Sequence, residues 1–272
     1  MSISYIKKKR AEIDNCNICG TYGKMTWDHV PPKAAYNETS AKVNTAFSGM
    51  PEENAYQKKY QNGIKFRSVC QKCNNELLSQ YDTVYANFIN KVASILDGGD
   101  ISNLNIEIEE DVRLLCKGII GHFLSAKDFY DEECTVDIAL RKYLLFDELS
   151  PELKIYYWIY PYKTINIIRD VVTGNVLGER FPKGMISVIA SFPIAFMIAM
   201  DDDAKTLPDL LDYQGTNRIP IDIRTMINPA TQKMRDYLWP CNIGDEKDDA
   251  SFVLAGSAGA ESSRIGIHEI EI

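Results

Sequence analysis

The chain has 272 residues, which allow one large domain or two smaller ones with a full hydrophobic core. Hydrophobic residues make up 45% and charged residues 25%, a composition typical of a globular protein rather than a disordered chain. The N-terminal basic cluster is followed by no apolar run, which argues against a secretory signal. The most apolar stretch, Met185 to Met200, is short for a membrane span and contains a proline. We therefore expect a cytoplasmic protein.

The net charge of −8 would disfavour a nucleic-acid partner if it were spread evenly. It is not spread evenly. Residues 1–74 carry 12 basic and 6 acidic side chains, whereas residues 75–272 carry 18 basic and 32 acidic ones. Charge fluctuates along any sequence, but a basic first section of net +6 is the part that could approach phosphate.

The first part of the chain predicts two strands and a helix. Thr26–Val30 is β-prone and is ended by two prolines, and Ile64–Cys70 alternates apolar and polar residues after the Asn62-Gly63 turn signal. The polar stretch between them, Asn37–Gln61, is predicted to be a long loop. Apolar residues then recur at three- and four-residue steps from Leu77 to Leu96, which predicts a helix that ends before Gly98-Gly99.

The second part predicts helices and strands in an α+β arrangement. Helices are expected at Asp111–Ala126 and Cys134–Leu149, strands within Lys154–Val172 and Met185–Met200, a short helix at Ala204–Tyr213 and a loose segment at Ala255–Ser263. The predicted organisation is a first domain at residues 1–97, followed by a mixed helix and antiparallel-sheet domain at residues 98–272.

Four of the seven cysteines form two CxxC pairs, Cys16/Cys19 and Cys70/Cys73. Two residues between thiols let both sulfurs of a pair reach one ion, and a reducing compartment disfavours disulfides. The spacing predicts a structural zinc site. The other three cysteines, Cys116, Cys134 and Cys241, are expected to be buried thiols.

His29 is one of only three histidines, and it directly follows an acid, Asp28. A neutral imidazole can accept a proton near pH 7. Asn74 follows the last zinc cysteine, so a zinc ion joining the two knuckles would draw Asp28 and Asn74 together. Their oxygens are hard donors that suit Mg²⁺ or Mn²⁺. Of the other two histidines, His122 is expected in the core, and His268 has no partner motif.

The order CxxC, DHVPPK, VCxxCNN resembles the HNH (ββα-metal) endonucleases, in particular their four-cysteine branch, over about Asp14 to Lys91. The resemblance implies an N-terminal ββα-metal module in which His29 is the general base. It also implies that Asp28 and Asn74 hold one Mg²⁺ or Mn²⁺ and that the four cysteines hold zinc. Asp82 stands where some relatives keep an acid, and it either assists the metal or is an exposed helix acid or cap.

Basic and aromatic side chains near this motif are candidates for holding nucleic acid. The proposed phosphate-binding residues are Arg67, Lys65 and Lys33, with Lys24 and Lys7–Arg10 as further candidates. Lys65 stands where many relatives have an asparagine. Trp27 and Tyr22 either stack on bases or, as the favoured expectation, pack around the zinc knuckle.

The sequence thus predicts a metal-dependent endonuclease that cleaves nucleic acid, chiefly DNA. One alternative is a non-catalytic zinc-knuckle protein that binds nucleic acid or another partner. A second is an effector nuclease of a bacterial phage-defence or restriction system, activated by a partner or signal. The acidic residues 98–272 would then serve regulation, partner binding or homodimer formation.

Overall fold

The computed structural model describes residues 10–37, 40–45, 58–61, 63–97, 105–160, 165–173, 184–200, 207–222 and 251–256. The strands are β1 (Ile13–Asn15), β2 (Tyr22–His29), β3 (Ser40–Thr45), β4 (Lys58–Gln61), β5 (Lys65–Cys70), β6 (Asn105–Glu109), β7 (Leu153–Ile159), β8 (Ile165–Thr173), β9 (Gly184–Ser191), β10 (Ile194–Met200), β11 (Arg218–Asp222) and β12 (Ser251–Gly256). The helices are the π-helical turn η1 (Cys73–Leu78), α1 (Ser79–Asp97), α2 (Val112–Ser125), α3 (Thr135–Phe146) and the 3₁₀ helix η3 (Leu210–Tyr213). The predicted mixed α+β class is confirmed.

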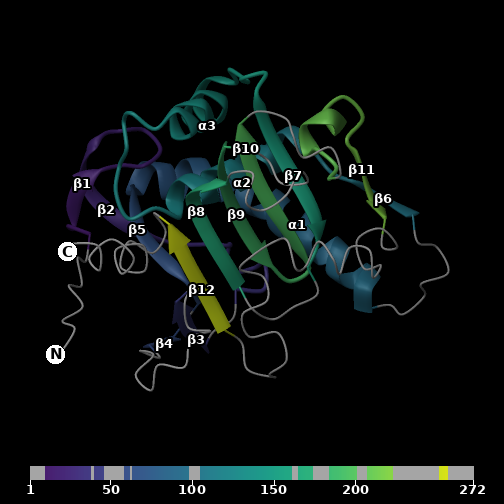
Figure 1. Cartoon of the computed structure of the whole chain (residues 1–272), viewed down its shortest axis with the longest axis horizontal. Coiled ribbons are helices and arrows are strands. Elements are labelled where there is room, and N and C mark those ends of the chain that lie inside the picture. The colour runs from purple at the N-terminus through teal and green to yellow at the C-terminus, as the bar shows by residue number, and fades with distance from the viewer. Residues whose placement is uncertain are drawn as a thin grey trace, which may run out of the picture.

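A seven-stranded sheet with the order β4-β3-β12-β8-β9-β10-β7 forms the centre of the molecule (Figure 1). Its strands are antiparallel except for β12, which runs parallel to both β3 and β8. Successive side chains of β7 alternate between two buried clusters, with Ile155 and Tyr157 in one and Tyr156 and Trp158 in the other. That period of two is what a strand buried on both faces requires.

Helices α1 and α2 pack on one face of this sheet, where Phe196 of β10 lies against Tyr85 and Phe88 of α1 (Figure 1). Helix α2 is buried along nearly its whole length, because α1, α3 and the sheet surround it. Asp111 caps its start by accepting a hydrogen bond from the Leu114 N–H at 3.0 Å. One hydrophobic cluster runs from Cys16 to Ile221, so residues on both sides of the predicted boundary at residue 97 share it.

A separate three-stranded antiparallel sheet, β1-β2-β5, precedes η1 and α1. The predicted strand, strand, helix order is therefore present. The pairing of β2 with β5 contains a bulge between Thr26 and Trp27. Bulges re-aim the side chains that follow them, and this bulge lies directly before Asp28 and His29.

One expectation about an irregular segment is wrong, because the stretch predicted as a long loop, Asn37–Gln61, contains β3 and β4. Of the loose segment predicted at Ala255–Ser263, the first two residues belong to β12, and the others lie outside the described residues. Parallel pairing of β3 with β12 joins residues at opposite ends of the chain, so no local pattern announces it. Of the short helix predicted at Ala204–Tyr213, the structure describes residues 207–213, of which Leu210–Tyr213 form the 3₁₀ helix η3. Within the described residues, no helix has the length and apolar character to cross a membrane.

A buried asparagine fastens the end of β2 to the start of β5. The Asn37 amide donates hydrogen bonds to the carbonyls of Pro31 at 2.7 Å and Ile64 at 3.1 Å, and its Oδ1 accepts from the Ile64 N–H at 3.0 Å. Gly63, with a positive φ of 75°, makes room for this side chain. These hydrogen bonds of Asn37, here called the Asn37 clamp, fix the turn that follows Asp28 and His29.

We predict that Gly63→Ala destabilises the protein by about 1–3 kcal/mol, because its Cβ would lie 2.5 Å from Asn37 Oδ1 on a backbone that disfavours side chains. Gly23→Ala is the matched control, since nothing lies within 4 Å of a Cβ there. Urea unfolding of both variants measures the difference. Equal stabilities would show that the clamp does not constrain this turn.

Candidate functional site

The four cysteines of the two CxxC pairs lie together, as predicted. The Sγ atoms of Cys16, Cys19, Cys70 and Cys73 are all within 4.8 Å of one another, and none of them is in a disulfide. Zn–S bonds of about 2.3 Å in a tetrahedron place sulfurs about 3.8 Å apart. The Cys19 and Cys70 Sγ atoms are 3.8 Å apart, so this cluster could hold a zinc ion.

The crowded thiols do not titrate alike. A hydrogen bond from the Cys73 thiol, together with backbone N–H groups, lowers the pKa of Cys16 to about 5. The same hydrogen bond, burial and neighbouring sulfur charge raise the pKa of Cys73. Four crowded thiolates would repel one another, so full deprotonation of the cluster requires a cation to balance the charge, as a zinc ion would.

Asn74, the residue after the last cysteine, connects the start of the helix to β2. Its Nδ2 donates to Thr26 Oγ1 and to the Trp27 carbonyl, both at 3.0 Å. Asn74 lies in the π-helical turn η1, a form often found at functional sites. The zinc knuckle and this amide thus fix β2 directly before Asp28 and His29.

The neighbours Asp28 and His29 differ in environment. Asp28 is only 5% exposed, and its Oδ2 lies 3.7 Å from Nδ1 of His122. His29 is the last residue of β2 and is half-buried. Adjacent strand residues point to opposite faces, which separates the surroundings of the two side chains. The structure thus brings Asp28 to His122 and brings Asn74 to the backbone beside Asp28, while the roles of Asp28, His29 and Asn74 stay predictions.

His122 is fully buried, as expected, but it is also part of this site, which the sequence did not indicate. Its Nε2 lies 3.0 Å from Oδ1 of Asp82, and its ring meets Tyr85 edge to face. Burial alone would lower the pKa of His122, yet Asp28 and Asp82 outweigh it and raise that pKa to about 9. At 3.7 Å the contact with Asp28 is too long for a hydrogen bond, so it acts through charge.

Aromatic and basic side chains share the exposed side of β2 and β5. The Trp27 ring is 47% exposed, with the Arg67 guanidinium 4.6 Å and the Lys65 ammonium 5.8 Å from its centre. Tyr22, also on β2, is still more exposed, so the favoured expectation that both rings pack around the knuckle is wrong. The strand bulge at Trp27 turns this ring outward beside the predicted phosphate-binding residues.

The other phosphate-binding candidates differ in their exposure to solvent. Lys33 is exposed, in the turn after β2. Arg10 is directed inward: its side chain is 5% exposed, pairs with Asp14 at 2.9 Å and donates to Asn17 Oδ1 at 2.8 Å. It is therefore not available for phosphate, and Lys7 to Lys9 lie outside the described residues.

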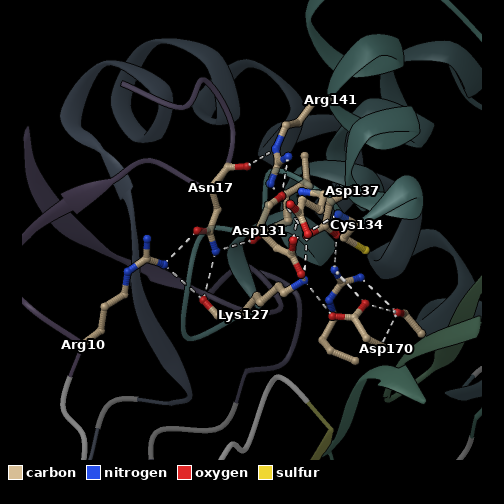
Figure 2. Close-up of polar contacts among 12 residues, drawn as sticks. Arg10, Asn17, Lys127, Asp131, Cys134, Asp137, Arg141 and Asp170 are labelled. Atoms are coloured by element: carbon tan, nitrogen blue, oxygen red, sulfur yellow. Dashed lines mark hydrogen bonds and ion pairs between the residues drawn. The ribbon is translucent and has the colours of Figure 1, made fainter. Parts of the chain in front are cut away.

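A buried network of charges joins the four-cysteine knuckle to the rest of the molecule (Figure 2). The Asp137 carboxylate pairs with Arg169 through Oδ1 at 2.6 Å and with Lys127 through Oδ2 at 2.8 Å. Lys127 also pairs with Asp170 at 2.9 Å. Cys134 lies within metal-ligand reach of Asp137 and Asp170. Because Lys127 and Arg169 already neutralise both carboxylates, we assign this group as an ion-pair network.

Asn17, inside the first CxxC pair, is the point where the knuckle meets this network (Figure 2). Its amide donates to the carbonyls of Leu124 at 3.0 Å and Lys127 at 2.9 Å, and its own carbonyl accepts from Arg141 Nε at 2.8 Å. The loop that carries Cys16 and Cys19 is thereby fastened to the end of α2 and to α3.

Comparison with known proteins identifies no relative of this chain. No family model matches the sequence, and no curated protein or solved structure matches it. The interpretation of the site therefore depends on the residues and the geometry of this chain.

We predict that Cys73→Ser loses bound zinc and destabilises the strand, strand, helix region, because three sulfurs cannot close the tetrahedral site. Zinc content by atomic absorption and thermal unfolding measure both effects. Cys134→Ser is the control and should keep zinc at the wild-type level. Zinc retained by Cys73→Ser, or lost by Cys134→Ser, would contradict the assignment of the site.

We predict that Lys127→Met destabilises the protein by about 3–5 kcal/mol, because it removes one of the two buried cations of the network and leaves Arg169 alone to balance Asp137 and Asp170. Lys24→Met removes a pair of similar length, 2.9 Å to Glu12, but on the surface, and should change stability little. Denaturant unfolding compares the two variants. Equal effects would mean that the network contributes no more than a surface pair.

Proposed function

We propose that the chain is a metal-dependent endonuclease of the HNH type that hydrolyses phosphodiester bonds in nucleic acid, chiefly DNA. The observation that carries the proposal is the pair of Asn74 hydrogen bonds to Thr26 and to the Trp27 carbonyl. They fasten the residue that follows the cysteine cluster to the strand that ends in Asp28 and His29. This is the strand, strand, helix order that the motif resemblance implies.

The donor set fits a hard divalent cation such as Mg²⁺ or Mn²⁺. Asn74 uses its two N–H hydrogens on Thr26 and Trp27, which leaves its amide oxygen as the group for a ligand. Asp28 supplies a carboxylate one residue after the Trp27 carbonyl that Asn74 binds. A bound cation would neutralise charge on the phosphoryl and leaving oxygens of the substrate.

His29 is the residue proposed to act on water. In its neutral form the imidazole would accept the proton of an attacking water, and the new hydroxyl oxygen would bond to phosphorus as the 3′ oxygen leaves. Its place at the end of β2, after the clamped backbone of Trp27 and Asp28, holds it in a fixed position relative to both.

Substrate binding is assigned to the exposed side of β2 and β5. Arg67 and Lys65 supply charge for the phosphates, and Trp27 offers a partly exposed ring to a base. Lys33 is exposed in the following turn and extends the same basic region. The acidic remainder of the chain would repel a polyanion, which restricts contact to this region.

The same surface supports a second candidate, a zinc-knuckle protein that binds nucleic acid without cutting it. Trp27 and Arg67 would serve binding whether or not His29 acts on water. A partner-activated effector nuclease also stays a proposal. It would keep the catalytic residues but cut only when another gene product is added.

We predict that His29→Ala abolishes cleavage of supercoiled plasmid in Mg²⁺ or Mn²⁺ but keeps zinc, because the base is lost and the cysteine cluster is untouched. Arg67→Ala should instead weaken DNA binding and make it less dependent on salt, since a phosphate contact is removed. Gel assays and fluorescence anisotropy measure the two effects.

The control for the proposal is the wild-type protein across divalent metals. Binding without cutting under every metal, with or without cellular extract, would favour the non-catalytic candidate. Cutting that survives in His29→Ala would remove the histidine from its proposed role.

A further inference from the structure

Three distant segments meet in a buried chain of charged groups that runs from α1 through α2 to β2. Asp82 Oδ1 lies 3.0 Å from His122 Nε2, and His122 Nδ1 lies 3.7 Å from Asp28 Oδ2. The imidazole is fully buried, whereas Asp82 is partly exposed. Each ring nitrogen of His122 thus faces a different carboxylate.

The helices are built so that this chain can form. Gly118 and Gly121 of α2 lie against α1 and η1, and a Cβ on Gly121 would collide with the Leu78 side chain. The missing side chains let the two helices approach closely, which brings Asp82 within hydrogen-bond distance of the ring. Tyr85, one turn after Asp82, packs on the ring edge to face at 5.4 Å between centroids. His122 is therefore held on both sides before it meets Asp28.

The facing atoms of Asp28 and His122 are buried, and neither Asp28 Oδ2 nor His122 Nδ1 has a hydrogen-bond partner. Burying polar atoms in this way is costly, and apolar side chains in place of Asp28, His122 and Asp82 together could pack without that cost. Stability alone therefore does not explain a histidine here. The contact also affects His29, which lies outside the core, because Asp28 directly precedes His29 at the end of β2.

We propose that His122 is a positioning residue of the nuclease site, which orients the Asp28 carboxylate from behind and is itself oriented by Asp82 and Tyr85. The proposal rests on the proposed function, because it takes Asp28 as a ligand of the divalent cation. Removal of a group that holds a metal ligand in place commonly lowers metal affinity or activity by about 10- to 100-fold. The role would be carried by α2, which lies outside the segment that resembles the HNH family.

Two conservative substitutions separate this role from simple packing. The amide of asparagine occupies the place of Nδ1, which faces Asp28, whereas the amide of glutamine occupies the place of Nε2, which faces Asp82. We expect His122→Gln and His122→Ala to weaken Mn²⁺ binding by the DNA-free protein roughly 10- to 100-fold. His122→Asn should retain most of the wild-type affinity. Electron paramagnetic resonance of free Mn²⁺ measures this without any cleavage step.

Lys117→Met is the matched control, because it also removes a buried cation from α2. Lys117 pairs with Asp147 at a distance of 2.7 Å and is not part of the contact with Asp28. It should destabilise the protein but leave Mn²⁺ affinity unchanged. Zinc content and melting temperature, recorded for every variant, identify any that fail to fold. If His122→Ala does not fold, the Asn and Gln variants still decide.

The outcomes separate this inference from the proposed function. Wild-type Mn²⁺ affinity in a folded His122→Gln variant, or equal losses in the Gln and Lys117→Met variants, would overturn the inference even if the wild type cuts DNA. Loss of Mn²⁺ affinity in His122→Gln with recovery in His122→Asn would support it even if no nucleic acid is cut. In that case only the nuclease activity would fail.

Discussion

The rest of the site depends on four sulfurs brought together from two places more than 50 residues apart in the chain. A short antiparallel sheet and one π-helical turn cannot bury enough apolar surface to fix each other on their own. The cysteine cluster supplies that constraint. It sets where the helix begins, and therefore where Asn74 meets the backbone of β2. A zinc ion at this cluster would make the constraint independent of the small size of the core.

Charged groups also join this unit to the larger sheet, beside the hydrophobic cluster that both parts share. Asn17 and Lys127 connect the knuckle to α2 and α3, and Asp137 with Arg169 extends the connection to β8. Buried ion pairs seldom raise stability above that of an apolar core, but they tolerate few alternative arrangements. We infer that they specify how the knuckle is placed, with α2 as the helix that both the network and His122 share.

The charge distribution also distinguishes one region of the surface from the rest. The half-buried cations Arg67 and Lys65 lie beside Trp27 next to the proposed catalytic residues, while the acidic excess lies in the later part of the chain. A polyanion would be attracted to one region and repelled by the rest. Under the proposed function, contact with nucleic acid would be limited to that small area.

Local patterns determined much of this protein: the two CxxC pairs, the strands β2 and β5, the helix after Cys73 and the later helices and strands follow from spacing and periodicity, which depend on near neighbours. Tertiary structure alone decided the rest. His122 joins Asp28 and Asp82, Arg10 is directed inward, Trp27 is exposed, and β3 pairs with β12. The physical reason is the same in each case. Each depends on burial and on distances to other segments, which no short stretch of sequence contains.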